Sequence, residues 1–513
     1  MARWPQMRVD PREHRPRALP ALLALVAALI SSCGSTVAGQ VAATAGPGVL
    51  DTGNGAPSAS GTPSGQAPSS LGTLTLPATP AATNGQAQAL PHPTGSSKAS
   101  TITQAGKTIR LGKGVTTTTV KIGMVYSPDL NDAQKATGSG NLQTGDPRLQ
   151  EEALVAEINR TGGLGGRHVV LDEYSISATT PDVQAAFNAA CQHFVLDAKV
   201  FAVVSAGTDS FGACLEEGGV LEVGSDLTAA TADTTRRQPH GLRPAGITMD
   251  DAARLMVQGL DDQHYFTNSV VGVISFDAPP YQRTIKDVML PELQRVGHAA
   301  KDVFYAQTPN SVSDYGSMTS SISSAVLRFR TYGITHVVMF DQQGRIATYF
   351  IPQAESQQYK PRYGFTSQAG FQVGVTSGGI PKDQAAGAAG IGWLPVFDVP
   401  LDPKVFSPGA KRCAAFFASK GMPASGENAT VIQQFQCQDA WLLKAVMDQL
   451  NADVTRDAFT SVVDGGSGYL AAANLGQLGF APGHHDGTTV VRDVAWNATC
   501  SCFRYVGRDH VVR

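Results

Sequence analysis

The sequence has few of the features that mark an enzyme or a nucleic-acid-binding protein. Only 16% of the 513 residues are charged, the formal net charge is −3, and no long run of one sign occurs. A nucleic-acid-binding surface normally shows a basic stripe, so we exclude that class. The chain also has no P-loop and no H-E-x-x-H metalloprotease motif. The segment GTDSFG, residues 207–212, is not the G-x-S-x-G of a serine hydrolase. These absences predict a protein that is not an enzyme.

Long apolar runs are scarce as well. The most prominent one, Ala18 to Ser32, has about fifteen residues, whereas a membrane-spanning helix needs about twenty. A short apolar run that follows basic residues and ends in small ones is typical of a signal peptide. The basic residues here are five arginines: Arg3, Arg8, Arg12, Arg15 and Arg17. The run therefore predicts export.

The end of this run, Ile30-Ser31-Ser32-Cys33, resembles the bacterial lipobox. The resemblance implies that residues 1–32 are a lipoprotein signal peptide and that Cys33 carries a diacylglyceryl thioether, with acylation of the new N-terminus. Two or more acyl chains give stable anchoring, here to the outer face of the cell membrane. The alternative is a plain signal peptide in which Cys33 is incidental.

Charged residues are nearly absent from the next segment, 33–117, which is rich in Gly, Ser, Thr, Ala and Pro. Such a composition cannot bury enough apolar surface to offset the entropy lost on folding. We expect a disordered tether, and about eighty residues of coil reach on the order of 50 Å. A tether of this kind suits a lipid anchor.

Six cysteines follow the tether, an even number that predicts disulfides in an exported protein. Fifteen pairings are possible. Local pairs are favoured, Cys191–Cys214 and Cys413–Cys437, which leaves Cys500–Cys502. The last pair is questionable, because alternate residues of a strand lie near the upper Cα distance for a bridge. A zinc site is the alternative, but C-x-x-C and a suitably spaced histidine pair are both missing.

Apolar strands and helices alternate through the remaining 400 or so residues. A strand at 119–127 precedes a helix that begins at Asp146-Pro147 and ends at Gly162-Gly163. A further helix is expected to start at Thr180-Pro181, and Pro291 should kink the helix that begins at Tyr281. Strand–helix repeats of this kind predict parallel sheets with helices on both faces. We expect two doubly wound, Rossmann-like lobes: 118–245, 246–375, and a C-terminal part, 376–513, that completes both.

The segment AEINRTGGLGGRHVVLDEYS, residues 156–175, resembles the branched-chain amino-acid-binding proteins, which are type I periplasmic binding proteins of ABC importers. Later segments agree in order: DAKVFAVVSAGTDS, GVLEVGSDLTAATADT, VVGVISFDAPPYQ, GITHVVMF and FQCQDAWLLKAVMDQL. The resemblance covers about residues 118–508. It implies two lobes joined by a hinge, a ligand cleft between them, no cofactor, and an ABC permease and ATPase as partners of a monomeric receptor.

The loops that follow the strands of the first lobe are expected to carry part of the ligand site, because open α/β sheets bind ligands outside the carboxyl ends of their strands. The family pattern assigns ligand contacts to Ser205, Gly207, Thr208, Asp209, Asp226 and Thr228. At residues 207–209, backbone N–H groups of a helix N-terminus would hold a carboxylate. The alternatives are a simple helix cap there and a solvated loop acid at Asp226, which replaces a small residue of the family. Tyr126, at the end of the first strand, is expected to line the cleft or to be a rim or core residue.

The second lobe contributes the matching half of the predicted site. Phe276, Asp277 and Tyr281 correspond to the family's Asp…Tyr-Gly segment, although a glutamine follows the tyrosine here. Asp277 would pair with an ammonium group of the ligand. Asp341 and Gln368 end later strands and are either ligand contacts or turn residues. Together with Asp209 and Asp226, these acids hint at an ammonium-bearing ligand, although loop aspartates often serve as caps.

Two further motifs suggest chemistry and are better explained as turns. GGLGGRH, residues 162–168, lies between a helix and a strand, whereas a phosphate-binding loop lies between a strand and a helix. GHHDG, residues 483–487, would offer adjacent histidines that cannot share one face, so we expect no metal site. The sequence thus predicts a lipid-anchored receptor for a small polar molecule such as an amino acid, amide or carboxylate. A sensing lipoprotein of the same fold and, less well supported, a secreted hydrolase are the alternatives.

Overall fold

A computed structural model describes residues 99–104, 107–136, 143–204, 207–225, 230–309, 314–342, 344–402 and 404–512. Cys33 and most of the predicted tether lie outside these residues, as do three of the predicted ligand residues, Ser205, Asp226 and Thr228. None of the helices in these ranges combines the length and the apolar character needed to span a bilayer.

The first half of the molecule is built on a parallel sheet of five strands in the order β4–β3–β5–β6–β7. Its members are β3 (Thr119–Tyr126), β4 (His168–Ser175), β5 (Ala202–Val203), β6 (Leu221–Val223) and β7 (Gly241–Leu242). Successive side chains of β3 enter different cores: Met124 joins one apolar cluster and Val125 another. Both faces of the sheet are therefore covered, as the nearly continuous apolar run of β3 requires.

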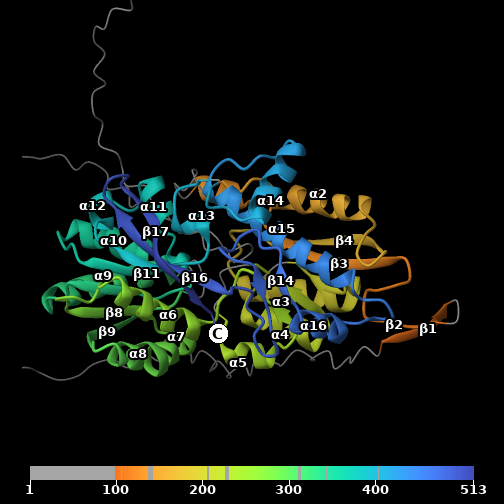
Figure 1. Cartoon of the computed structure of the whole chain (residues 1–513), viewed down its shortest axis with the longest axis horizontal. Coiled ribbons are helices and arrows are strands. Elements are labelled where there is room, and N and C mark those ends of the chain that lie inside the picture. Colours follow the sequence, from red (N-terminus) through yellow and green to blue (C-terminus); the bar gives the residue numbers. More distant parts are fainter. Residues whose placement is uncertain are drawn as a thin grey trace, which may run out of the picture.

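The second half is built on a sheet of seven strands in the order β17–β16–β12–β11–β10–β8–β9 (Figure 1). The strands from β8 to β12 run parallel, and β16 and β17 are antiparallel additions at one edge. The bounds are β8 (Val271–Phe276), β9 (Ala300–Ala306), β10 (His336–Met339), β11 (Arg362–Thr366), β12 (Ala389–Gly392), β16 (Val490–Asn497) and β17 (Cys502–Val511). Val273 and Ile274 again enter different clusters, so this sheet is also covered on both faces. The predicted α/β architecture is confirmed.

Helices connect the strands of both sheets. In the first half they are α1 (Leu130–Ala136), α2 (Pro147–Arg160), α3 (Val183–Gln192) with the π-helix η1 (His193–Ala198), α4 (Asp209–Glu217) and α5 (Ala232–Arg237). In the second half they are α6 (Met249–Asp262), α7 (Pro279–Thr284), the π-helix η2 (Ile285–Met289), α8 (Leu290–Arg295), α9 (Tyr315–Thr331), α10 (Arg345–Ser356), the 3₁₀ helix η4 (Ser367–Ala369), α11 (Phe371–Ser377), α12 (Lys382–Ala385) and α13 (Pro395–Asp398).

The C-terminal third contributes to both halves. The helices α14 (Pro408–Ser419), α15 (Glu427–Met447) and α16 (Arg456–Asp464) carry Phe417, Leu443 and Phe459 into the core of the first sheet. The short hairpin β14 (Ser467–Tyr469) and β15 (Leu478–Gly479) follows, and β16 and β17 then return to the second sheet. The chain thus crosses between the halves three times.

A small sheet projects at the far end of the first half (Figure 1). The hairpin β1 (Ser100–Gln104) and β2 (Lys107–Leu111) pairs through β2 with β13 (Asp453–Val454). Arg110 and Asp453 reinforce this pairing with an ion pair of 2.6 Å. The segment that continues from the N-terminal region therefore enters the fold at the end of the first half.

Local signals in the sequence were largely correct, with one error in a helix start. Asp146 accepts hydrogen bonds from the N–H groups of Arg148 and Leu149, and so caps α2 as predicted. Capping of the next helix at Thr180 was wrong, because Asp182 caps α3 through the N–H of Ala185. Near Pro291 the α-helix is interrupted by the π-helix η2, which ends at Met289, two residues before the proline; such π segments are a known cause of bends in helices.

The three predicted disulfides are present. Cys191–Cys214 and Cys413–Cys437 have Cα–Cα distances of 6.3 and 6.0 Å. The doubt about Cys500–Cys502 rested on strand geometry, which does not apply, because Cys500 lies in the turn before β17. Ser501 adopts a left-handed conformation with φ of 49°, and this brings the two Cα atoms to 5.2 Å.

Candidate ligand-binding site

The central strand of the first sheet ends in a tyrosine and a buried serine. Tyr126 is half-buried and packs against the core beneath the sheet. Ser127 is buried, and its hydroxyl has no hydrogen-bond partner. Asp129 accepts hydrogen bonds from the Ser177 hydroxyl at 2.6 Å and from the N–H of Ala178 at 2.7 Å, and these bonds lower its pKa against the opposing effect of burial. At the end of β3, the side-chain group without a hydrogen-bond partner is therefore the uncharged hydroxyl of Ser127.

The start of α4 carries three of the predicted ligand residues. Thr208 caps the helix by accepting from the N–H of Phe211 at 3.3 Å. Asp209 forms an ion pair with Arg237 at 3.1 Å and accepts a hydrogen bond from Gln238 at 3.1 Å. Gly207 lies so close to the ring of Phe211 that a side chain there would clash with it. Thr208 therefore caps α4, and contact of Gly207, Thr208 and Asp209 with a ligand remains a prediction.

A polar group that the sequence analysis missed lies beside the end of β6. Asp439, on the buried face of α15, accepts a hydrogen bond from the N–H of Ser225 at 2.9 Å. Glu151, on α2, is buried, and its pKa is raised to about 8 by burial and by the neighbouring Asp439. Burial and the neighbouring carboxylate therefore favour the uncharged form of Glu151. In the sequence, Glu151 is simply an acid near the start of a helix. Acids are common there because they complement the helix dipole, so nothing marked Glu151 as a site residue.

The end of β8 positions the aromatic part of the predicted second half-site. The rings of Phe276 and Tyr281 lie 5.8 Å apart in an edge-to-face arrangement. Burial and the nearby Asp341 carboxylate raise the pKa of the Tyr281 hydroxyl, against the opposing effect of the Gln342 backbone. Asp277 accepts hydrogen bonds from the N–H of Thr308 at 2.8 Å and from its hydroxyl at 2.6 Å. These bonds join the end of β8 to the end of β9 and engage the carboxylate expected to meet a ligand ammonium.

Asp341, at the end of β10, serves as a turn residue. It accepts hydrogen bonds from the N–H groups of Gly344 at 3.0 Å and Ile346 at 2.7 Å, at the start of α10. Burial raises its pKa to about 6 against the effect of these bonds. The carboxylate of Asp341 thus occupies the place where an anionic ligand would meet the N-terminus of α10.

Two glutamines at the ends of β10 and β11 are buried without full hydrogen bonding. Gln342 is 1% exposed, and neither its amide nitrogen nor its amide oxygen has a partner. Gln368, one of the predicted residues, is 3% exposed, and its amide oxygen has none. Gln342 was missed because nothing in the sequence separates it from its neighbours in the loop. Buried polar groups without partners are rare and call for an explanation.

The end of β12 holds a buried carboxyl group. Asp398 accepts hydrogen bonds from the N–H of Leu394 at 2.9 Å, the Ser367 hydroxyl at 3.0 Å and the Tyr505 hydroxyl at 2.7 Å. Burial raises its pKa to about 7 in spite of these bonds. Through these bonds Asp398 links the ends of β11 and β12 to β17.

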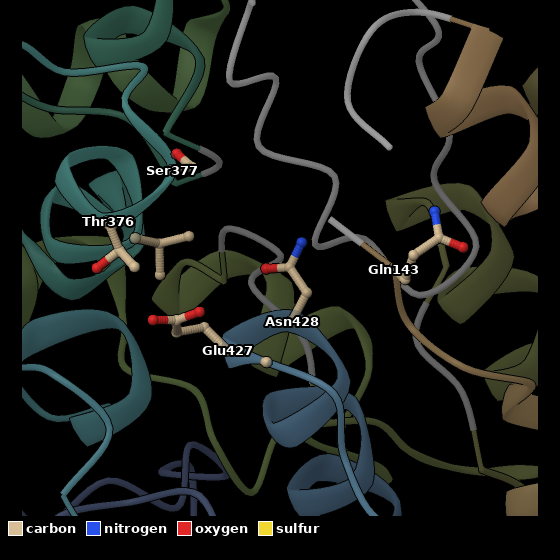
Figure 2. A pocket seen from close by; sticks show the side chains of 7 residues that line it. Gln143, Thr376, Ser377, Glu427 and Asn428 are labelled. Atoms are coloured by element: carbon tan, nitrogen blue, oxygen red, sulfur yellow. The ribbon is translucent and has the colours of Figure 1, made fainter. Parts of the chain in front are cut away.

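A cavity of about 160 Å³ lies between elements of the two halves. In Figure 2, Thr376 and Ser377 of α11 lie on one side, Gln143 lies on the opposite side, and Glu427 and Asn428 at the start of α15 lie between them. Val373 and Gly426 complete the lining. Among the predicted ligand residues that the structure describes, none lines this cavity, and no motif in the sequence pointed to it.

The histidine-rich turn and one further cluster bear on metal binding. His485 is buried and hydrogen-bonds Asp464 at 2.9 Å, which explains its presence in the turn at 483–487. Elsewhere, one oxygen of Asp262, one oxygen of Asp493 and one nitrogen of His510 lie within 4.8 Å of one another. Arg508 already pairs with Asp262 at 2.8 Å, and His510 with Asp493 at 2.8 Å. These pairings account for the cluster as part of the packing of α6 on β16 and β17.

Comparisons with known proteins are informative at the level of structure. No family model and no curated protein matches the chain. A solved solute-binding protein of an ABC transporter from Rhodopseudomonas palustris, in complex with 3,4-dihydroxybenzoic acid, is 12% identical; the match covers 77% of this chain and 98% of that one, with a TM-score of 0.55. An ABC transporter substrate-binding protein from Desulfitobacterium hafniense, in complex with leucine, is 14% identical over 76% and 100% of the chains, with a TM-score of 0.52.

A third solved structure agrees with these two. It is a branched-chain amino acid ABC transporter protein from Thermus thermophilus with bound valine, 13% identical, and the match covers 77% of this chain and 96% of that one, with a TM-score of 0.53. In each case nearly all of the solved chain is matched, so the likeness extends over both sheets. The resemblance seen in the sequence is therefore confirmed at the level of fold, and the chain has the two-lobed α/β fold of the type I periplasmic binding proteins of ABC transporters.

Proposed function

We propose that this protein is an extracytoplasmic solute-binding protein that captures a small polar molecule between its two halves and delivers it to an ABC permease. The observation that carries the proposal is the arrangement of two doubly wound sheets linked by three crossings of the chain. Sheets of this type bind ligands at the carboxyl ends of their strands, and two linked bodies can close around a ligand by a hinge. The solved proteins of this fold described above contain benzoates or amino acids as ligands.

The two halves act as lobes in this proposal. The ranges 118–245 and 246–375 form the bodies of the lobes, and 376–513 completes both. Strand-end residues of each lobe face the ligand: Tyr126, Ser205, Gly207, Thr208, Asp209, Asp226 and Thr228 from the first, and Phe276, Asp277, Tyr281, Asp341 and Gln368 from the second. Binding and release need no bond to be made or broken, so the protein carries out no reaction, and the energy for transport comes from a separate ATPase.

The lipid anchor at Cys33 is a second part of the proposal and rests on the sequence of residues 30–33. A soluble receptor held by lipid stays close to its permease, and the charge-poor segment that follows gives it reach. Cys33→Ser removes the only thiol to which the lipid would be attached. We expect this variant to move from the membrane fraction to the soluble extracytoplasmic fraction, and a variant that stays with the membrane would refute the anchor.

Thermal shift with a panel of small molecules tests the binding function. The panel contains amino acids, amides, short-chain carboxylates and aromatic acids, and the protein is the full chain with Cys33→Ser, so that no detergent is needed. A ligand present at 100 times its Kd stabilises the folded state by about 2.7 kcal/mol, which shifts the melting temperature measurably. If no small molecule shifts the melting temperature, and isothermal titration also detects no binding, the solute-receptor proposal fails.

A further inference from the structure

Gln342 and Gln368 lie side by side at the ends of neighbouring strands. Val338 of β10 pairs with Gly364 of β11, and four positions further along each strand lie Gln342 and Gln368. A methyl group on Gly344 would lie 2.8 Å from the carbonyl oxygen of Gln368, so the two loops remain in contact beyond the strands. The two residues therefore lie on adjacent strand-end loops, and the amide of each is buried.

The aromatic pair of the second half borders the same place. Met339 of β10 pairs with Ile274 of β8, so Gln342 continues this register opposite Asp277. The Tyr281 hydroxyl also lies near the backbone of Gln342, which lowers its pKa against the effect of burial, and the Tyr281 ring packs edge-on against Phe276. An amide pair beside two aromatic rings is an arrangement that holds a partly apolar molecule by one polar group.

Two acids close to these glutamines, Asp277 and Asp341, are already engaged. Asp277 is bonded to Thr308, and Asp341 to the N–H groups of Gly344 and Ile346. Arg345 lies over the ring of Tyr315 with its guanidinium carbon 5.8 Å from the ring centre, and its charge offsets that of Asp341. An ammonium or carboxylate group of a ligand would therefore have to compete with bonds that the fold itself uses.

In the first half, too, two strand-end acids form hydrogen bonds or ion pairs, whereas an uncharged side chain lacks a partner. Asp129 is bonded to Ser177 and Ala178, and Asp209 to Arg237, whereas the buried hydroxyl of Ser127 has no partner. Among the described strand-end residues of both sheets, the buried side-chain atoms that lack partners belong to the alcohol of Ser127, the amides of Gln342 and Gln368, and one oxygen of Asp398, whose carboxyl pKa is raised by burial to about 7. The alcohol and the two amides are uncharged at any ordinary pH, and each amide offers both a donor and an acceptor.

Building on the solute-binding function above, we propose that Gln342 and Gln368 bind a carboxamide group of the ligand, so that the solute is an uncharged amide and not an amino acid or a carboxylate. A carboxamide presents one acceptor and one N–H donor in a plane, and it can exchange two hydrogen bonds with a glutamine side chain. A carboxylate offers only acceptors, and it would face the amide oxygens of Gln342 and Gln368 without a proton to share. An ammonium group offers only donors, and it would leave the amide nitrogen of Gln342 without an acceptor.

Matched pairs of probes test the ligand class on the purified full chain. The pairs are 4-hydroxybenzamide against 4-hydroxybenzoate and 4-methylpentanamide against leucine, each compared by thermal shift and isothermal titration. We expect the two amides to raise the melting temperature and their charged counterparts to have little effect. If a charged counterpart binds as tightly as its amide or more tightly, the inference is wrong while the solute-binding function stands. If no molecule of these pairs or of the wider panel binds, both are wrong.

A variant of Gln342, compared with the same substitution at Gln384, tests the role of Gln342 in binding. Gln342 and Gln384 are each 1% exposed, but Gln384 donates to Glu355 and Tyr359 and accepts from Tyr363. Gln384→Leu should lower the melting temperature of the unliganded protein and leave the shift produced by an amide in place. Gln342→Leu breaks no side-chain hydrogen bond, so it should keep or raise that melting temperature and abolish the amide shift. If Gln342→Leu destabilises the protein as Gln384→Leu does, or if the amide shift survives it, the inference is overturned.

Discussion

At the scale of single residues, the strand ends of the second sheet separate acids that serve the fold from amides that do not. Asp398 belongs to the first kind, because one of its oxygens accepts three hydrogen bonds, from Leu394, Ser367 and Tyr505. The side chain is 1% exposed, and its other oxygen has no partner. A carboxyl group in this position is most stable in its protonated form, because a buried charge without a counter-ion is costly.

Asp398 should therefore make the stability of the protein depend on pH. Burial raises its pKa from 3.8 to about 7 in the folded state, so the folded protein binds this proton more tightly than the unfolded chain. The resulting stabilisation is complete below about pH 4 and is lost as the pH rises through 7; each pKa unit corresponds to about 1.4 kcal/mol. Asp398→Asn cannot ionise, and it keeps an acceptor for the three bonds.

We expect the melting temperature of Asp398→Asn, relative to that of the unaltered protein, to rise between pH 4.5 and pH 8 by a few degrees. Asp287→Asn, at an exposed position on η2, is the matched control and should show no such trend. Differential scanning calorimetry at several pH values measures the difference. A difference that is the same at both pH values would mean that Asp398 is ionised throughout.

The same residues show which parts of the candidate site could be predicted from the sequence. Asp277 and Asp341 were identified as strand-end residues, and they lie there, because an apolar run followed by an acid marks the end of a buried strand. Their partners were not predictable: Asp277 bonds Thr308, which lies 31 positions further along and is brought near by the pairing of β8 with β9. Gln342 had no signal at all, because only burial without a partner sets it apart.

At the scale of elements, the sequence predicted well where local chemistry decides. Asp146, Pro147 and Gly162-Gly163 fix the ends of α2 through capping, a preset φ and a left-handed turn. Prediction failed where a neighbouring element decides. The start of α3 moved from Thr180 to Asp182, and the helices near His193 and Ile285 became π-helices, which no local signal marks. Cys500–Cys502 formed because Ser501 turns the chain before β17.

At the scale of the whole molecule, the first crossing (residues 243–248) is hydrogen-bonded to the third (residues 480–489), and residues on either side of the crossings add bonds that make them one linkage. The Trp393 indole N–H donates to the carbonyl of Ala245 at 3.1 Å, and the N–H of Leu475 donates to the carbonyl of Trp393 at 2.8 Å. The N–H of Thr488 donates to the carbonyl of Gly246 at 3.1 Å. Apart from α15, which reaches the cores of both halves, and Ala473, between β14 and β15, which joins the core of the second half, the described residues of each half pack in separate cores. A rotation about this linkage would open the molecule without disturbing either sheet.

A cross-link between the halves tests whether such a rotation admits the ligand. Gln143 and Ser377 line opposite sides of the cavity in Figure 2 and are both partly exposed, so Gln143→Cys with Ser377→Cys, in a Cys33→Ser background, provides two reactive thiols. The six remaining cysteines are in disulfides. Joining the two thiols with a short bis-maleimide should slow release of a bound ligand on the order of tenfold or more, because the halves can no longer separate.

Lys286→Cys with Gln294→Cys, both exposed on the helix segment 279–295, forms the matched cross-link within one half and should leave the rate of ligand release unchanged. Equal release rates for the two cross-linked proteins, measured by stopped-flow fluorescence, would mean that the ligand enters without separation of the halves.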